Sequence, residues 1–200
     1  MDSQKIKLLL ASASPRRKEL LENIGLEFDV VPSDVDETLW NDAVPQDFVM
    51  TLAERKAEAV AEGHKDSWIL AADTVVVYKE KILGKPADRA DAVKMIEMLQ
   101  GRTHYVVTGV ALIKPGGVTL VDCEKTYVKF RNMTHEECEA YVDQGESMDK
   151  AGSYAIQGRG SMLVEGIDGC YSNVVGLPVN KVSLMFEKAG YSLFENWRKD

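Results

Sequence analysis

Apolar positions along the chain follow two alternating patterns. Short runs rich in Leu, Ile and Val predict strands, and these lie at residues 7–11, 28–31, 68–78, 82–83, 104–113 and 118–131. Apolar residues three and four apart predict helices between them, which open at Pro15, Pro45, Thr134 and Pro178, with a further helix around residues 92–99. Because hairpins accompany the alternation, the pattern indicates an α/β fold with a mixed sheet.

Local signals mark several element boundaries. Serine before proline at residues 14–15 is typical of a helix start, and Thr134 with Glu137 three residues on is a capping-box pattern. Residues 79–81 are expected to turn the strand at 68–78 into a hairpin. Residues 145–176 are rich in glycine and lack periodicity, so we expect an irregular, site-forming loop region there.

Length and composition fit one globular domain over residues 1–200, or two small lobes that share a core. Apolar runs are far shorter than the ~20 residues that cross a membrane, and the first residues lack a secretory signal. Three widely spaced cysteines argue against a disulfide framework. A cytoplasmic location is therefore expected. The net charge of −8 argues against stable nucleic-acid binding, but a local positive cluster can still bind a small anion.

The first candidate site contains Ser12, Ser14, Arg16 and Arg17. A strand that leads small hydroxyl residues into a helix N-terminus presents backbone N–H groups at the positive end of the helix dipole, an arrangement that binds anions. The two guanidinium groups add forked donors suited to phosphate oxygens. The alternative is a capped surface helix with two solvated arginines.

The second candidate is Asp73, which stands inside the apolar run at residues 69–77. Burying a carboxylate costs free energy unless it is paired, metal-bound or in a cleft, and acidic residues are poor strand formers. The position predicts a general base or a metal ligand. The alternative is a polar position at the end of a strand.

A third candidate is the glycine-rich segment around Gln157, whose amide can donate to and accept from the edge of a base. A glycine-rich surface loop is the alternative. P-loop, Rossmann and nucleophile-elbow motifs are absent from the sequence, and its three histidines form no zinc motif.

Six short motifs that occur in order resemble the Maf family over essentially the whole chain. Each is weak alone, but six in register are specific. They are Ser12-x-Ser14-Pro15-Arg16-Arg17, Ala72-Asp73-Thr74-Val75-Val76, Gly84-Lys85-Pro86, Gly101-x-x-His104-x-Val106-x-Thr108-Gly109-Val110, Asp149-Lys150-Ala151-Gly152-x-Tyr154-x-Ile156-Gln157-Gly158 and Asn173-Val174-Val175-Gly176-Leu177-Pro178.

The resemblance implies a three-layer fold similar to that of inosine triphosphate pyrophosphatases, with two lobes around a deep cleft. It implies hydrolysis of a nucleoside triphosphate between its α- and β-phosphates, with Mg²⁺ or Mn²⁺ as cofactor, and homodimer formation. Gln157 is similar to the dTTP/UTP pyrophosphatase branch, whereas the 7-methyl-GTP branch carries glutamate there. Cys170, where relatives often carry serine, is a minor departure.

The resemblance also implies roles for individual residues. Asp73 is the proton acceptor, and Asp73 with Glu37 would hold the metal. Base specificity maps to Arg16, Thr74 and Gln157. The phosphate-binding residues are Ser12, Ser14, Arg16, Arg17, Lys56, Lys85 and Lys150. Taken singly, the lysines and Glu37 are more often solvated than ligand-bound, so their assignment rests on the resemblance.

Two alternatives stay open at this point. The enzyme alternative is a pyrophosphatase for 7-methyl-GTP or other non-canonical nucleotides. The other is a nucleotide-binding regulator of cell division in which hydrolysis is vestigial, although Asp73 and the basic residues argue against a dead enzyme.

Overall fold

The computed structural model describes residues 6–37 and 44–197. Within this part of the chain seven strands form one mixed sheet in the order β2-β1-β3-β5-β6-β7, with β4 paired to β3. The β1 strand pairs in parallel with β2 and β3, whereas β4 and β7 pair antiparallel with β3 and β6. The strands are β1 (Leu8–Leu10), β2 (Asp29–Val30), β3 (Trp68–Tyr78), β4 (Lys81–Leu83), β5 (Thr103–Lys114), β6 (Val118–Phe130) and β7 (Val164–Asp168).

Six α-helices and three short 3-10 helices connect these strands in the described residues. The α-helices are α1 (Pro15–Asn23), α2 (Pro45–Ala61), α3 (Arg89–Leu99), α4 (His135–Val142), α5 (Tyr171–Val175) and α6 (Val179–Lys188). The 3-10 helices are η1 (Ala151–Ser153), η2 (Gly158–Met162) and η3 (Leu193–Trp197). Of the described helices, none is long and apolar enough to cross a membrane.

The chain divides into two compact units. Unit 1 contains the described residues up to Asp73, then Thr108–Glu124, then the chain from Gly176 onward. Unit 2 contains Thr74–Val107 and Lys125–Val175. Strands β3, β5 and β6 each contribute residues to both units. The single domain predicted over residues 1–200 stays a prediction.

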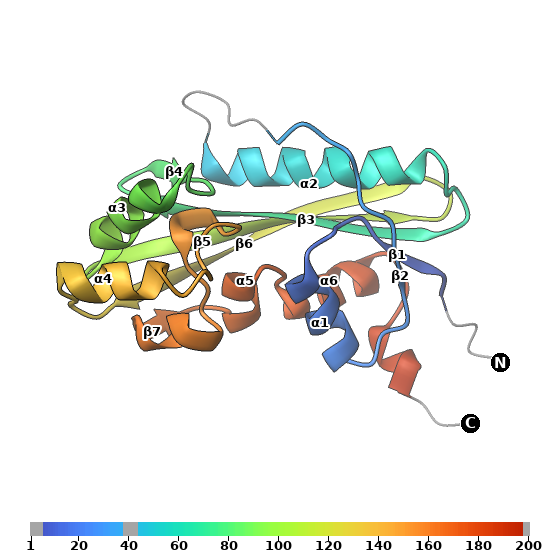
Figure 1. The fold of residues 1–200 in the computed structure, drawn as a ribbon. Coiled ribbons are helices and arrows are strands. Elements are labelled where there is room, and N and C mark those ends of the chain that lie inside the picture. Colours follow the sequence, from blue (N-terminus) through green and yellow to red (C-terminus); the bar gives the residue numbers. More distant parts are fainter. Residues whose placement is uncertain (1–5, 38–43, 198–200) are drawn as a thin grey trace. The chain divides into compact units, whose positions relative to one another are not determined.

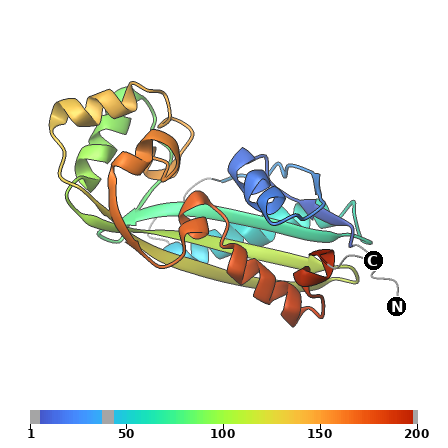
Figure 2. The ribbon, with the colours of Figure 1, turned by 90° about the horizontal axis from the view of Figure 1, so that it is seen from below.

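Unit 1 has three layers. On one face of its strands, α2 buries Ala53, Ala57 and Val60 against residues of β1, β3 and β5. On the other face, α1 and α6 bury Leu21 and Phe186 against the alternate residues of the same strands. Figures 1 and 2 show α2 on one side of these strands and α1 and α6 on the other. Because successive side chains of a strand point to opposite faces, one set of apolar strands supports both cores.

Unit 2 has a separate core. Helices α3 and α4 pack their apolar residues, including Ile96 and Tyr141, against Val76, Val128 and Phe130 of the strands. The predicted capping box of α4 is confirmed, since the Thr134 side chain accepts from the Glu137 backbone and the Glu137 side chain accepts from the Thr134 backbone.

Two local predictions need correction. Residues 145–176 are not wholly irregular, because they contain β7 and α5. The β7 side chains are mostly exposed, so the strand has no hydrophobic periodicity and is defined by its pairing with β6. The hairpin turn consists of Lys79 and Glu80 alone, both at positive φ (48° and 62°), while Lys81 already pairs with Tyr78. Positive φ at both central residues is the geometry of a two-residue hairpin turn.

Candidate active site

Two carboxylates of unit 1 converge on one buried ammonium group. Lys56 Nζ lies 2.7 Å from Asp73 Oδ1 and 2.6 Å from Glu37 Oε1. The Lys56 and Asp73 side chains are 8% and 12% exposed, whereas that of Glu37 is 50% exposed. The ion pair therefore offsets the cost of burying Asp73 within an apolar strand, and Glu37 provides the side of the cluster that water reaches.

The position of Lys56 on α2 explains its burial. Leu52 and Val60 lie four residues before and after it, and both are buried. Residues four apart share one face of a helix, so Lys56 projects from the face that covers the sheet. A lysine taken singly is more often solvated, but the apolar residues four positions before and after Lys56 are a sequence signal for its burial.

Arg17 is held by two neutral oxygens. Its Nη1 donates to Ser12 Oγ at 3.0 Å, and its Nε donates to the Gly176 carbonyl at 2.8 Å. Burial lowers the pKa of Arg17, and the neighbouring Asp73 and Glu37 carboxylates oppose this effect. The guanidinium charge of Arg17 therefore belongs to the same electrostatic cluster as these carboxylates, together with the adjacent charge of Arg16. The contact with Gly176, 159 residues away in the chain, has no sequence signal.

The start of α1 differs from the prediction in one respect. The helix does begin at Pro15, but the Ser14 side chain makes no capping hydrogen bond. Instead, the Ser14 backbone N–H donates to Ser12 Oγ at 3.2 Å. Ser12 Oγ thereby joins the backbone at the helix start to the Arg17 side chain. Ser12 as a whole is 8% exposed, so these hydrogen bonds lie largely away from solvent.

The remaining predicted site residues belong to unit 2. Lys150 Nζ lies 2.6 Å from Asp149 Oδ1, and the Lys150 side chain is largely buried. The Gly152 N–H donates to the Gly84 carbonyl at 3.0 Å, which joins the segment that carries Lys150 to the segment that carries Lys85. Gly152 has φ +65° and a Cβ there would meet Val76 at 2.9 Å, so this close approach requires glycine.

Thr74 and Gln157, the other predicted residues of unit 2, are both half-buried. Thr74 follows Asp73 in β3, so the two side chains point to opposite faces of the strand. Gln157 immediately precedes η2, and the backbone of Gly158 next to it adopts φ +61°. These two residues, predicted to contribute to base specificity, thus lie in a strand and next to a tight turn.

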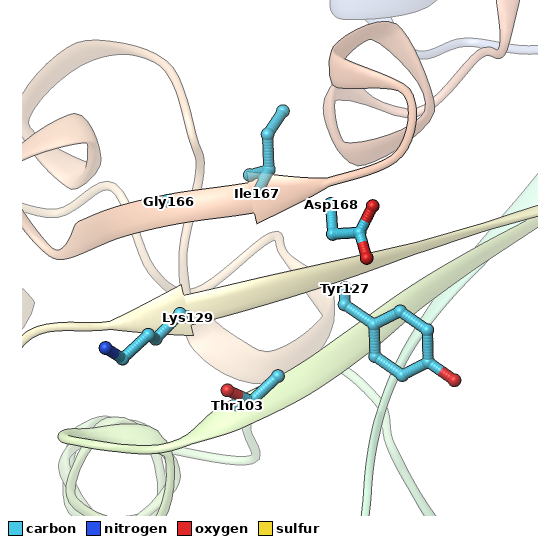
Figure 3. A pocket seen from close by; sticks show the side chains of 6 residues that line it. All are labelled: Thr103, Tyr127, Lys129, Gly166, Ile167 and Asp168. Carbon is cyan, nitrogen blue, oxygen red and sulfur yellow. The ribbon is translucent and has the colours of Figure 1, made fainter.

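Six residues line a surface pocket of unit 2, and none of them is predicted for the site. The pocket has a volume of 360 Å³ and is lined by residues of β5, β6 and β7, shown in Figure 3: Thr103, Tyr127, Lys129, Gly166, Ile167 and Asp168. The Lys129 ammonium is already paired with Glu165 at 2.6 Å.

The carboxylates of Asp73 and Glu37 are suited to a divalent cation that is held by few protein ligands. Among the described residues, no group of three or more His, Cys, Asp and Glu side chains is placed to hold a metal ion. Asp73 and Glu37, however, each bring a carboxylate oxygen to the same ammonium. Mg²⁺ is commonly bound by one or two carboxylates together with substrate phosphates, so these two residues fit such an ion.

The fold and the chain can now be compared with known proteins. The structure is similar to that of a HAM1 protein from Coxiella burnetii, with a TM-score of 0.52 and 15% identity, over 92% of this chain and 99% of that one. This likeness, with the mixed sheet and the three layers of unit 1, confirms the predicted α/β fold class.

Sequence relatives define the family. Residues 7–189 match the family described as Maf-like protein. A dTTP/UTP pyrophosphatase from Bacillus anthracis is 50% identical over 88% of this chain and 92% of its own. A dTTP/UTP pyrophosphatase from Caldicellulosiruptor saccharolyticus is 47% identical over 94% of this chain and 98% of its own. The chain belongs to the Maf-like protein family, as its motifs predict.

Proposed function

We propose that this protein is a nucleoside triphosphate pyrophosphatase that hydrolyses dTTP and UTP to the monophosphate and pyrophosphate. Relatives about 50% identical over most of the chain bear this function in their names. The observation that carries the proposal is the cluster of Asp73 and Glu37 around Lys56. The cluster provides a buried base, a second carboxylate and a fixed positive charge in one place.

In this proposal Asp73 is the proton acceptor. The oxygen of a water molecule forms a bond to the α-phosphorus while the bond from that phosphorus to the α–β bridging oxygen breaks. One water proton passes to the Asp73 carboxylate, and pyrophosphate leaves. The contact of Lys56 with Oδ1 fixes the orientation of the carboxylate on β3. A base that is held in place before substrate binds needs less reorganisation at the moment of reaction.

Asp73 and Glu37 would also hold the divalent cation, Mg²⁺ or Mn²⁺, by their carboxylate oxygens. When bound, such a cation supplies positive charge against phosphate oxygens. Arg16, Arg17 and Lys56 would add fixed positive charge to this part of the site.

The serines and the other basic residues complete the proposed phosphate contacts. Ser12 and Ser14 would orient the α1 turn toward a phosphate, and Lys85 and Lys150 would neutralise charge on the leaving pyrophosphate. Base recognition is proposed for Arg16, Thr74 and Gln157, whose side chains offer donors and acceptors to the edge of a pyrimidine.

The test is pyrophosphate release from dTTP, UTP, CTP, 7-methyl-GTP and ITP with Mg²⁺ or Mn²⁺. The wild type should prefer dTTP and UTP. Asp73→Asn should lower turnover by about 10²–10⁴-fold, the usual contribution of a general base. The matched control is Asp122→Asn, which removes another ion-paired carboxylate of unit 1, 3.1 Å from Lys181, and should leave turnover unchanged.

The outcomes separate the parts of the proposal. Release from dTTP and UTP that survives in Asp73→Asn would remove Asp73 as the base. A preference for 7-methyl-GTP or ITP would establish the alternative substrate class, and no release from any nucleotide would favour the division-regulator alternative. Gln157→Glu should shift the preference among bases, and an unchanged ranking would remove Gln157 from base recognition.

Three further expectations stay predictions. They are a cytoplasmic location, homodimer formation and the lack of stable nucleic-acid binding. The last follows from the net charge of −8 and can be checked by a gel-shift assay with DNA and RNA at physiological salt.

A further inference from the structure

A buried histidine in unit 2 contacts the segment that leads to Gln157. His104 lies in β5 and is 2% exposed. Its Nε2 is 2.7 Å from the Tyr154 hydroxyl, and Tyr154 is three residues before Gln157. The Phe130 ring packs edge-on against both rings, with centroids 4.9 Å from His104 and 4.7 Å from Tyr154. The His104 ring itself also packs edge-on against Tyr154, at 5.3 Å between centroids. One hydrogen bond and two ring contacts therefore locate Tyr154.

Neither partner of this hydrogen bond is suited to proton transfer at neutral pH. Burial lowers the pKa of His104 to about 4 and raises the pKa of Tyr154 well above its ordinary value. His104 Nδ1 has no hydrogen-bond partner among the residues that the structure describes. With a pKa lowered in this way the imidazole is uncharged at pH 7, and it contacts the Tyr154 hydroxyl as a neutral ring.

A second tyrosine holds the next residue. The Ala155 N–H donates to the Tyr141 hydroxyl at 3.2 Å, and Tyr141 belongs to α4. On the near side Ser153 adopts φ 63°, which is uncommon for a residue with a side chain. On the far side a Cβ at Gly160 would overlap the Ala155 carbonyl. The backbone from 153 to 160 is thus fixed by contacts on both sides of Gln157.

We infer that His104 and Tyr141 are positioning residues for base recognition, because through Tyr154 and Ala155 they set the orientation of Gln157. This inference rests on the proposed function and deepens it. A hydrogen-bonding side chain selects among bases only when its donor and acceptor meet the base edge in a fixed geometry, and displacements near 1 Å are costly. Substrate choice then depends on a hydrogen-bonded set two and three residues from the side chain that reads the base.

The test removes one hydroxyl at a time. Tyr154→Phe and Tyr141→Phe keep the rings and remove the hydroxyls that bond His104 and the Ala155 N–H. Each should lower the ratio of kcat/KM for UTP to that for 7-methyl-GTP by roughly tenfold, within the range that one binding-pocket contact supplies. The change should be mainly in KM for UTP. Amide hydrogen exchange at residues 155–158 should become faster in both variants.

The matched control is Tyr105→Phe. Tyr105 is also a buried tyrosine of unit 2, and its ring packs against Tyr127 and Lys125 of β6. This variant should keep both the substrate ratio and the exchange rates of the wild type. Thermal unfolding of all three variants establishes that they are folded, and Tyr141→Phe serves if Tyr154→Phe does not fold.

Failure of the inference differs from failure of the proposed function. If the wild type prefers UTP and both variants keep its substrate ratio, the positioning role is overturned and the proposed function stands. If the wild type releases pyrophosphate from no nucleotide, the proposed function fails and this base-recognition role fails with it. A fall in the ratio that Tyr105→Phe shares would show general loosening of unit 2 and would also overturn the inference.

Discussion

The buried neutral imidazole of His104 predicts a specific pH dependence of stability. We consider a change from pH 7 to pH 4.5, applied to the wild type and to His104→Gln. Glutamine reaches a similar distance and can hydrogen-bond the Tyr154 hydroxyl, but it does not titrate. The difference between the two proteins at each pH therefore isolates the protonation of this one side chain.

The magnitude follows from the two pKa values of the histidine. Its ordinary pKa is 6.5, and burial lowers the pKa to about 4 in the folded protein. Between these values the unfolded chain binds a proton that the folded chain does not, so the free energy of unfolding falls as the pH falls. A pKa difference of about 2.5, at about 1.36 kcal/mol for each pKa unit, gives about 3 kcal/mol in full. Roughly 2 kcal/mol of this is lost between pH 7 and pH 4.5.

Urea denaturation of the wild type and His104→Gln at pH 7, 6, 5 and 4.5 measures the free energy of unfolding of each protein at each pH. His135→Gln is a control with the opposite sign. Glu97 and Glu139 raise the pKa of His135, so its contribution is present at low pH and is lost as the pH rises through the folded pKa. If the wild type and His104→Gln lose the same stability from pH 7 to pH 4.5, within about 0.5 kcal/mol, the buried neutral histidine is refuted.

Three other substitutions, each measured by urea denaturation, test a close backbone contact, a helix cap and a buried ion pair. Gly109→Ala should lower the free energy of unfolding by about 1–3 kcal/mol or prevent folding, because a Cβ there would overlap the α2 backbone at Val49. The control Gly63→Ala, with open space around it, should change this free energy by less than about 0.5 kcal/mol. Thr134→Ala should cost about 1 kcal/mol by removing the α4 cap, and Thr134→Ser should restore most of it; equal stability of the two would refute the cap. Lys56→Met should cost about 3 kcal/mol by leaving Asp73 buried without its ammonium, and an unchanged midpoint would show that the pair contributes nothing to stability.

Sequence reasoning succeeds where the determining interactions are local. Proline at the first position of α1 and α2 and the capping box of α4 act within one helical turn, so they identify the helix starts directly. Short continuous runs of apolar residues likewise identify the buried strands β1, β3 and β5. The β7 strand cannot be predicted in this way, because residues 164–168 are mostly exposed and are held in strand geometry by their pairing with β6.

The candidate site likewise combines a local signal that the sequence reveals with a distant contact that it does not. A carboxylate in an apolar strand is expected to have a partner, and Asp73 has one. Nothing local identifies that partner as Lys56, which is 17 residues away and on a helix. His104 could have been recognised by the same argument as Asp73, because it too is a polar residue within an apolar strand.

The order of the chain segments has a consequence for synthesis on the ribosome. The inner segments Thr74–Val107 and Lys125–Val175 complete unit 2, whereas the core of unit 1 also needs Leu177, Val182 and Phe186 from the end of the chain. Translation therefore delivers every residue of unit 2 before the strand that bears Asp73 can acquire its full apolar cover. A chain that lacked the residues after 175 would contain every segment of unit 2, but the core of unit 1 would still lack the apolar residues of α6.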